Sequence, residues 1–560
     1  MYYGNRFRLK LKIKNVIKRL MQNRFLRGKP TQSIGTAALI VATAGIASRI
    51  LGLVRDRILA SRFGAGDLLD VYYAAFRIPD LIFDLLVLGA LSAAFIPVFT
   101  HLLTHQQKDS AWRLASGVLS ILVLVVIVVS AICALFAPAI VHIIVPGFTE
   151  EKLTLTALFT RIMFLSPLLL GISAVFGGIL VSFKRFVVYA LAPMMYNIGI
   201  IIGAVFLVKI VGPSGLAWGV VLGAFLHLLM HYPATRHLGF RYVPIFQKAY
   251  KDSNVRRVII LMVPRIFGTA SNQIGFLIIA FFASTLASGS ISVFSFANNI
   301  QSVVLGLVGI PFAVATFPTL SALRAKESNV EFVHIVSCTL RRILFYVVPL
   351  SILLIALRAQ IVRVVLGSGN FDWEDTIMTF QVLGILSISL FAQSTIPLLA
   401  RTFYAMHNTK IPFYIALFSQ IVNIGIVILT IQSFGILGVA AAFSFASIVN
   451  MTLLLIVLHT KLHTLDGRQI IITMGKISFA ALIATLAIQT SKHLIGGNIQ
   501  LDTFFAVFVQ LIVSGSVGIA AYLLVSYFLN IEEFQTLRDK LLVRHFGRVP
   551  VAVEDQSETK

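Results

Sequence analysis

The sequence predicts an all-α integral membrane protein with fourteen transmembrane helices: two six-helix lobes related by a pseudo-two-fold axis along the membrane normal, plus a C-terminal helix pair. The first reason is composition, because 58% of the 560 residues are hydrophobic and 12% are charged, whereas soluble domains carry about 25% charged residues. The second is a series of fourteen apolar stretches, each near or above the ~20 residues that cross a ~30 Å hydrocarbon core. The third is the absence of the apolar–polar alternation that marks membrane barrels.

The stretches follow one another along the whole chain. They lie at 36–54, 71–99, 116–145, 157–181, 186–208, 212–232, 257–285, 290–318, 335–366, 376–404, 411–432, 435–458, 472–490 and 502–528. The gaps after even-numbered stretches are basic, and most odd-numbered gaps are not. Since cytoplasmic loops are enriched in Lys and Arg, this pattern predicts that both termini are cytoplasmic. It also accounts for the net charge of +24 without nucleic acid as a partner.

The predicted organisation has six parts. They are a basic cytoplasmic arm at 1–33, an N-terminal lobe at 34–232 (helices 1–6), a cytoplasmic inter-lobe loop at 233–256, a C-terminal lobe at 257–458 (helices 7–12), helices 13–14 at 472–528 and a cytoplasmic tail at 531–560. The arm has ten Lys or Arg and no acidic residue within residues 1–30, which favours contact with anionic lipid headgroups.

A weak internal repeat supports the two lobes. KRFVVYALAPMMYNIGIII at 184–202 resembles TKIPFYIALFSQIVNIGIVI at 409–428, and Ser48 to Gly52 resembles Pro264 to Gly268. Because each unit has an even number of spans, both have the same orientation, and a central site is expected between them. The sequence has no soluble domain and no phosphate-binding loop of the GxxxxGK[ST] type. We therefore expect a transporter rather than an enzyme, with no cofactor, driven by the membrane potential or a monovalent cation.

Charged residues concentrate in Ala47–Phe99, which has the hydrophobicity of two spans. Charge inside a span usually faces a wet cavity or another charge. Arg77, Asp80 and Asp84 fall at i, i+3 and i+7, on one face of a helix. Guanidinium groups bind phosphate oxygens in a fork, so arginines here favour a pyrophosphate ligand.

The candidate residues fall into two groups. Those expected to bind substrate are Ser48, Arg49, Arg55, Arg77, Arg265, Asn298 and Asn299. Those expected to tune charge or form a gate are Asp56, Asp70, Asp80 and Asp84. Two structural readings remain open, namely salt bridges between the first two helices without a ligand, and amides that only join helices. The histidine pairs 101/105 and 227/231 predict interfacial side chains rather than a metal site, because the Glu of HExxH is missing.

The stretch ASRILGLVRDRILASRFGAGDLLDVYYAAFRIPDL, which starts at Ala47, resembles the MurJ/MviN family of lipid II flippases, within the multidrug/oligosaccharidyl-lipid/polysaccharide exporter superfamily. LASGSIS (286–292), VLGLVGIPFAVATFP (304–318) and LLARTFYAMHNTKIP (398–412) also resemble it. The likeness covers about residues 36–530.

The resemblance implies fourteen helices and alternating access that moves an undecaprenyl-pyrophosphate-linked peptidoglycan precursor from the inner to the outer leaflet. It implies that Arg49, Arg55 and Asp70 are functionally required. It also implies a cationic cavity for the pyrophosphate and sugars, with helices 13–14 forming a groove for the lipid tail.

The chain departs from the family at several positions. The family's arginine pair on helix 2 falls on Phe83 and Asp84, its helix-2 glutamate on Leu88, and its Asp-Arg on helix 8 on Asn298 and Asn299. Our hypothesis is that Arg77 and Arg265 compensate. It predicts that Arg265→Ala abolishes complementation of a flippase-depleted cell, and full growth of that variant would remove the idea.

The sequence thus predicts a lipid II flippase of the bacterial cytoplasmic membrane, acting as a monomer surrounded by membrane lipids. Two alternatives use the same architecture: a flippase for another polyprenyl-pyrophosphate-linked glycan, and a small-molecule antiporter. The antiporter reading calls for an acidic cation site, whereas the cavity motif is net basic. A third alternative, a membrane scaffold without transport, predicts a solid core with no cavity.

Overall fold

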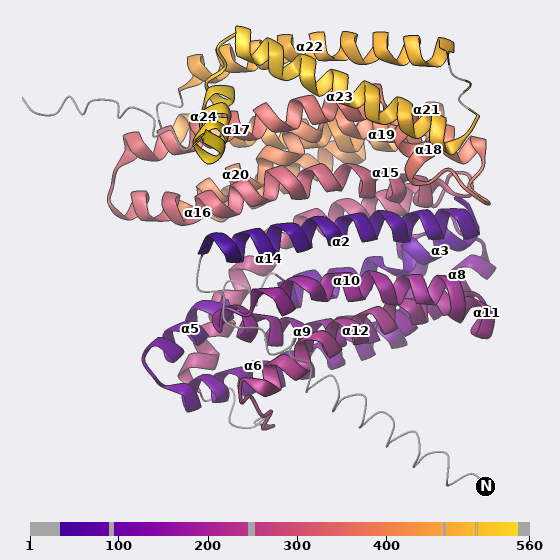
Figure 1. Ribbon diagram of the computed structural model, residues 1–560. Helices are drawn as coiled ribbons and strands as arrows, with labels where there is room; N and C mark the ends of the chain where they lie inside the picture. The colour runs from indigo at the N-terminus through magenta and orange to yellow at the C-terminus, as the bar shows by residue number, and fades with distance from the viewer. Residues whose placement is uncertain are drawn as a thin grey trace, which may run out of the picture. The chain divides into compact units, whose positions relative to one another are not determined.

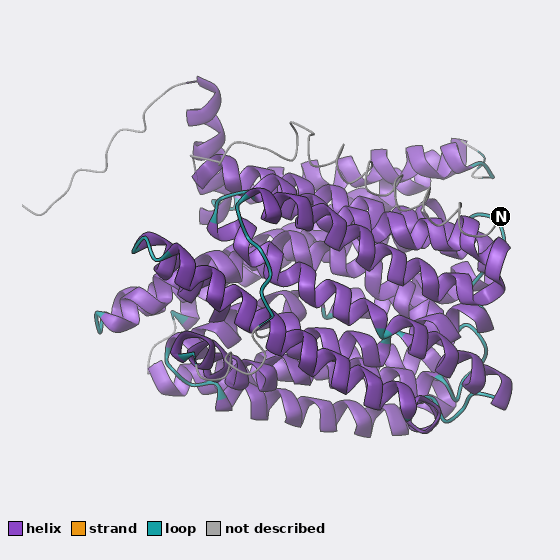
Figure 2. Cartoon of the chain, turned by 90° about the horizontal axis from the view of Figure 1, so that it is seen from below, coloured by secondary structure: helices purple, strands orange, loops and turns teal. Residues whose placement is uncertain are grey.

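The computed structural model describes residues 34–88, 94–244, 252–462, 466–498, 500 and 502–546. Within its helices, nothing is described of the side chains of 34–39, 88, 263–272 and 540–546. The basic arm at 1–33 and residues 547–560 of the predicted tail also lie outside the described residues. The described part consists of helices joined by loops and has no strand, as the sequence predicts (Figure 2).

Eight helices of the described part are long and apolar enough to cross a membrane, or nine if the bent pair Trp373–Ile388 and Leu390–Ala405 is one span. This confirms a helical membrane fold. The number fourteen stays a prediction. Two of the eight each cover two of the predicted stretches, namely Phe186–His237 and Lys410–Leu462. This is one reason why the number of long helices is smaller than the number of predicted stretches.

The chain divides into two compact units. Unit 1 lies within Met1–Asn299, Val365–Thr379 and Ala416–Ala442, and unit 2 within Ile300–Val364, Phe380–Ile415 and Phe443–Lys560. Three helices run from one unit into the other: α15 (Ser290–Val304), α19 (Trp373–Ile388) and α21 (Lys410–Leu462). The predicted relation of two lobes by a pseudo-two-fold axis is not addressed by this division and stays a prediction.

Unit 1 contains the remaining helices up to residue 283. They are α2 (Ile34–Phe63), α3 (Asp67–Ala75), α4 (Arg77–Phe83), α5 (Ile96–Thr104), α6 (Lys108–Leu135), α7 (Ala137–Ile144), α8 (Glu150–Met163), α9 (Leu165–Ser182), α10 (Phe186–Ile202), α11 (Val208–Val211), α12 (Gly215–His237) and α14 (Ser253–Ala283), with π-helical turns η1 (Asp84–Leu88) and η3 (Gly203–Leu207) and a 3₁₀ turn η4 (Gly212–Ser214). Helix α10 packs between α2 and α12 (Figure 1).

Helix α2 is unbroken over 30 residues and carries the first half of the charged motif. It ends at Phe63 because Gly64 adopts φ +65°, while the Gly64 N–H still bonds the Ala60 carbonyl at 2.8 Å. A residue with positive φ after the last helical turn is the usual way to stop a helix. Arg55 and Asp56 therefore lie about two turns before the end of a rigid element.

The second predicted span, 71–99, is not one helix. α3 ends at Ala75 and α4 begins at Arg77, followed by the π-helical turn η1. Pro79 has no N–H for the Ala75 carbonyl, and the hydroxyl of Thr160 on α8 donates to that carbonyl instead, at 3.5 Å. Arg77 therefore begins α4 one residue after α3 ends, with Phe76 between the two helices.

Glycines bring α10 and α12 into close contact. A Cβ at Gly199 would lie 2.2 Å from the Cα of Gly223, so only glycine fits at this crossing. Small residues at such crossings let helix backbones approach, as is common in membrane bundles. The contact fixes α10, which carries Asn197 toward α2 on its other side.

Unit 2 contains most of the later helices. They are η5 (Leu305–Gly309, a π-helical turn), α16 (Ile310–Ala325), α17 (Asn329–Ala356), α18 (Arg358–Val365), α20 (Leu390–Ala405), α22 (Gly467–Asn498), α23 (Phe504–Phe528) and α24 (Glu532–Phe546). The Arg341 guanidinium of α17 is 2% exposed and binds two carboxylates of α24, Glu532 at 2.7 Å and Glu533 at 3.2 Å. This ion pair attaches the last described helix to the bundle.

Candidate functional site

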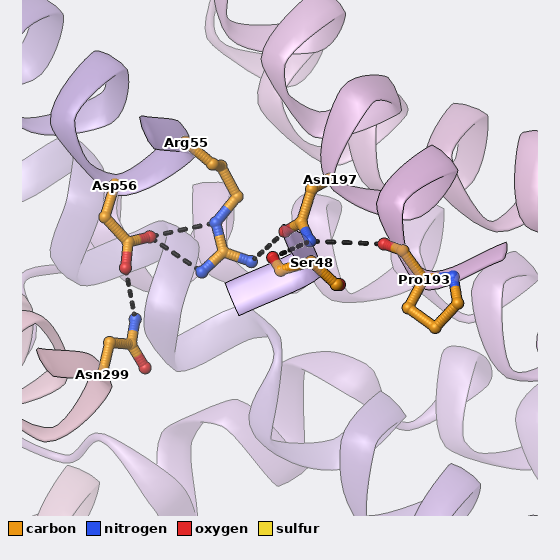
Figure 3. Close-up of polar contacts among 6 residues, drawn as sticks. All are labelled: Ser48, Arg55, Asp56, Pro193, Asn197 and Asn299. Atoms are coloured by element: carbon orange, nitrogen blue, oxygen red, sulfur yellow. Dashed lines mark hydrogen bonds and ion pairs between the residues drawn. The ribbon is translucent and has the colours of Figure 1, made fainter. Parts of the chain in front are cut away.

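The centre of the predicted motif is an ion pair between neighbours on α2 (Figure 3). Arg55 donates from Nε and Nη2 to Asp56 Oδ1, at 2.9 and 2.8 Å. Its Nη1 donates to Asn197 Oδ1 on α10 at 3.0 Å, and Asn299 Nδ2 on α15 donates to Asp56 Oδ2 at 3.0 Å. Asp56 is 2% exposed, so a buried carboxylate holds the guanidinium and joins three helices of unit 1.

Asn197 belongs to this cluster, although the sequence analysis does not name it as a candidate site residue. Its Nδ2 donates to the carbonyls of Pro193 at 3.2 Å and Ser48 at 3.4 Å, which leaves its oxygen for Arg55. A Cβ at Gly52 would lie 3.9 Å from that oxygen. The face of α2 that carries Ser48, Gly52 and Arg55 therefore lies against Asn197, as the spacing of these residues predicts. The indication in the sequence was that Asn197 is a single amide side chain among the apolar residues of the repeated segment 184–202.

A cavity of about 300 Å³ lies among α2, α3, α4, α10, α14 and α15 of unit 1. Five of the predicted site residues line it: Arg55, Arg77, Asp80, Asn298 and Asn299. Its remaining walls are largely aromatic, with three tyrosines and three phenylalanines, and Gln273 of α14 adds an amide. A concave site with aromatic walls and a few convergent polar groups is typical of a ligand site.

Arg77 is fixed by contacts that leave part of its guanidinium available. Its Cζ lies 5.3 Å from the centre of the Phe276 ring, within the range of a cation–π contact. Its Nη2 donates to the Ser295 hydroxyl at 3.5 Å. Neither Arg77 Nε nor the Tyr73 hydroxyl has a hydrogen-bond partner among the described residues. Both are buried donors that belong to residues of the cavity lining.

The two aspartates that follow Arg77 behave differently. Asp80, one turn along α4, is exposed and lines the cavity. Asp84 is the first residue of η1, accepts a hydrogen bond from Gln273 Nε2, and does not belong to the cavity lining. The shared face predicted for Arg77, Asp80 and Asp84 therefore supplies two cavity residues and one contact between helices.

Asp70 caps a helix and lies outside the cavity lining. It is 2% exposed and accepts hydrogen bonds from the Ser292 N–H and hydroxyl at 2.8 and 2.7 Å, and from the Gly289 N–H at 2.7 Å. These groups are at the N-terminus of α15, where a carboxylate is favoured. Asp70 thereby fixes the helix that presents Asn298 and Asn299.

The remaining candidates are Arg49, Ser48 and Arg265. Arg49 is half-buried on α2, and the cavity lining does not include it. Ser48 contributes its carbonyl to Asn197. The side chain of Arg265 lies outside the described residues. The charged residues of the cavity lining are Arg55, Arg77 and Asp80. Asp56, which binds Arg55, does not belong to that lining. The net basic cavity that the motif predicts stays a prediction.

The chain resembles known proteins over most of its length. Residues 59–509 match the family described as lipid II flippase MurJ. A probable lipid II flippase MurJ of Buchnera aphidicola is 31% identical over 430 residues, covering 76% of this chain and 82% of that protein. One of Vibrio cholerae is 30% identical over 437 residues, covering 76% and 83%.

Solved structures show the same fold. The inward closed conformation of a lipid II flippase MurJ has a TM-score of 0.72 at 24% identity, covering 90% of this chain and all of that one. An inward-facing multidrug resistance MATE transporter has a TM-score of 0.62 at 16% identity, covering 75% and 96%. The match across residues 59–509, together with these relatives, identifies a multi-pass bacterial membrane protein that belongs to the MurJ family of lipid II flippases.

Proposed function

We propose that this protein translocates lipid II, the lipid-linked peptidoglycan precursor, from the inner to the outer leaflet of the cytoplasmic membrane by alternating access. The observation that carries the proposal is the cavity of unit 1, to which the Ala47–Phe99 motif contributes Arg55, Arg77 and Asp80. Family membership supports the same substrate, since the relatives are named as probable lipid II flippases.

The cavity residues suit a pyrophosphate joined to sugars. Arg77 offers its Nε, and Arg55 offers a guanidinium that Asp56 and Asn197 already orient. Arginine binds phosphate oxygens in a planar fork, and orienting it beforehand lowers the entropy lost on binding. The amides of Asn298 and Asn299 and the tyrosine rings are suited to the hydroxyl, acetamido and apolar faces of sugars.

The wider arrangement is also part of the proposal. The lobes at 34–232 and 257–458 would alternate between inward and outward access, and 472–528 would receive the lipid tail. Transport would be non-enzymatic, driven by the membrane potential or a monovalent cation, in a monomer with cytoplasmic termini in the inner membrane. Arg49 and Arg265 would contribute positive charge along the path of the pyrophosphate, and Asp70 would hold α15 as part of the gate.

The test is the accessibility of labelled lipid II in vesicles that contain the full-length protein. Wild type should expose lipid II from the inner leaflet to an external reagent, and Arg55→Ala and Arg49→Ala should abolish this. Arg113→Ala is the matched control, because Arg113 is exposed on α6 and bonds only its neighbour Ser110 in the described contacts. Equal transport by wild type and Arg55→Ala would refute the role of the cavity.

A second candidate is a flippase for another polyprenyl-pyrophosphate-linked glycan. It is favoured by Asn298 and Asn299, which line the cavity as neutral amides at the positions where the family resemblance leads us to expect an acid and a base. Neutral donors place fewer charge constraints on a headgroup. Competition between lipid II and other polyprenyl-linked glycans in the same vesicles separates the two candidates.

A further inference from the structure

Two basic side chains lie at one end of unit 2, where α17, α18, α22 and α23 meet. The ammonium group of Lys492 on α22 donates to the Ala356 carbonyl at 3.1 Å, and Arg358 Nη1 donates to the neighbouring Ile355 carbonyl at 3.5 Å. Lys492 is half-buried and Arg358 is exposed. We propose that this basic pair, Arg358 and Lys492, binds the phosphate group of an anionic lipid in the outer leaflet.

The depth of the basic pair in the membrane follows from contacts at the two ends of α22 and α23. Near the opposite end, Lys476 of α22 donates to the Leu529 carbonyl, directly after α23, at 2.8 Å. At 1.5 Å per residue, Lys492 lies about 24 Å from Lys476 along α22. On α23, Gln510 donates to the Lys492 carbonyl and lies about 28 Å from Leu529. Since a hydrocarbon core is about 30 Å thick, the basic pair reaches one headgroup region when Lys476 lies at the other, and the orientation proposed above makes it the outer one.

The described contacts give the basic pair no acidic partner. Both side chains donate to main-chain carbonyls, and neither forms an ion pair with a described carboxylate. Arg358 is close enough to Lys492 for the two positive charges to repel each other. Basic residues are enriched on the cytoplasmic side of membrane proteins, so two cations without a counter-ion at the outer end are an exception that an anionic ligand explains.

Unit 1 contains the same succession of helices. There α6 has 28 residues and is followed, after Phe136, by the eight residues of α7. In unit 2, α17 has 28 residues and is followed, after Leu357, by the eight residues of α18. The sequences also match at Ile140-Val141 of α7 and Ile361-Val362 of α18. The two breaks are therefore copies of one local structure and can be compared.

The two copies differ in their cations. The match places Ala137 at the position of Arg358. In the described contacts, one cation serves the end of α6, namely Arg161, whose Nε donates to the Ala134 carbonyl at 3.0 Å. In unit 2, both Arg358 and Lys492 serve the end of α17. Because the break forms with a single cation in unit 1, the second cation in unit 2 is not explained by the local structure alone.

Neighbouring residues hold the basic pair in place. A Cβ at Gly384 of α19 would lie 3.0 Å from Arg358 Cδ, and Arg358 Cζ lies 5.8 Å from the centre of the Phe380 ring, one turn earlier on α19. On the other side, Gln360 Nε2 of α18 donates to Gln510 Oε1 at 2.9 Å, and Gln510 Nε2 donates to the main chain of the lysine at 3.0 Å. Cations that are oriented beforehand lose less entropy when they bind a ligand.

The chemistry and the position of the basic pair favour a lipid phosphate. Guanidinium and ammonium groups both bind phosphate oxygens. At the same end of α22 and α23, Leu494 is 62% exposed and Phe505 is 71% exposed, which suits contact with a lipid and not with a free phosphate ion. Two lipids have the required group. They are an anionic phospholipid and, on the proposed function, the polyprenyl pyrophosphate after translocation.

The first test measures lipid binding by native mass spectrometry of the full-length protein, delipidated in detergent and incubated with phosphatidylglycerol or phosphatidylcholine. Arg358→Gln and Lys492→Gln should each weaken phosphatidylglycerol binding by about fivefold, and Arg358→Lys should retain most of it. Arg161→Gln is the matched control, because it removes the cation at the end of α6. If Lys492→Gln does not fold, the exposed Arg358 still provides the test through Arg358→Gln. Equal phosphatidylglycerol binding by wild type and the glutamine variants, or an equal loss of phosphatidylcholine, overturns the proposal.

The second test locates the lipid and identifies its source. A photoreactive phosphatidylglycerol in nanodiscs should cross-link to peptides from α18 and from the end of α22 that carries Lys492, and cross-links confined to other peptides overturn the proposal. Undecaprenyl pyrophosphate is then added. Displacement of the phospholipid from wild type identifies the translocated lipid as an occupant, whereas no displacement identifies the phospholipid, and either result supports a lipid-phosphate site. Neither test requires flipping, so a protein that does not flip lipid II counts against the proposed function and leaves this site standing.

Discussion

The ion pair of Arg55 and Asp56 allows one prediction to be worked out in magnitude. Asp56 is 2% exposed and accepts three hydrogen bonds, two from Arg55 and one from Asn299. A hydrogen bond to a charged group contributes about 1.5–3 kcal/mol. Arg55 is 21% exposed, so water partly replaces a lost partner and the full sum does not apply. We expect Asp56→Ala to lower the free energy of unfolding by about 3 kcal/mol.

Asp56→Asn should lower the free energy of unfolding by less, about 1–2 kcal/mol, because the neutral amide oxygen still accepts a hydrogen bond from Arg55. The assay is thermal unfolding in detergent, followed by tryptophan fluorescence. Asp109→Asn is the control, since Asp109 is exposed in the first turn of α6. If Asp56→Ala unfolds at the same temperature as this control, the cluster does not hold α2, α10 and α15 together, and our reading of the motif fails.

Three further predictions concern other contacts. A Cβ at Gly289 would lie 1.9 Å from the Ala65 carbonyl oxygen, at φ +89°, so Gly289→Ala should lower the thermal midpoint by more than any cavity variant. Arg77→Lys keeps the charge but loses the planar group, and the flipping rate in vesicles should fall by about tenfold. Burial raises the pKa of Glu533, so its contribution to stability is present at low pH and is lost as the pH rises through that pKa. Glu533→Gln should therefore flatten the pH dependence of the thermal midpoint. Glu532→Gln loses the 2.7 Å ion pair but keeps the pair of Arg341 with Glu533, so it should lower the midpoint only slightly at neutral pH.

Each of the three has a control or a contrary result. Gly475→Ala should be tolerated, because a Cβ there meets nothing within 4 Å, and equal midpoints for the two glycine variants would contradict the first prediction. Full transport by Arg77→Lys would show that charge alone suffices at that position. A pH profile of Glu533→Gln identical to that of wild type would show that the pKa of Glu533 is the same in the folded and unfolded protein.

The helical class and one face of the site could be predicted from the sequence because both follow from local periodicity. Ser48, Gly52 and Arg55 lie on one face of α2 at a spacing of three to four residues, and the structure places that face against α10. The break before Arg77 also had a local signal in Pro79, since proline removes a helical hydrogen bond. Such features depend on residues close together in the chain.

The partners of the site residues could not be predicted in the same way. Asn197 bonds Arg55 across 142 positions, and Asp70 bonds the start of α15 across more than 200. The pairing of Arg55 with its direct neighbour Asp56 was missed for another reason. Residues at i and i+1 diverge on a helix, yet the long arginine side chain bends back far enough to reach the carboxylate.

The pairing of Arg55 with its own acceptors bears on how an anionic lipid is both bound and released. Arg55 already donates to Asp56 and Asn197, so an arriving phosphate takes the place of one of these acceptors rather than meeting a bare cation. When the phosphate leaves, the guanidinium returns to its own partners, and at no stage is it buried without one. This exchange limits the affinity for the lipid, because the binding free energy is only the difference between the new contact of Arg55 with phosphate and the contact that it replaces. For the same reason, the exchange lowers the barrier to release of the lipid. A cavity of unpaired arginines would bind a pyrophosphate more tightly and turn over more slowly, so Asp56→Asn should retain lipid II longer while flipping it less often.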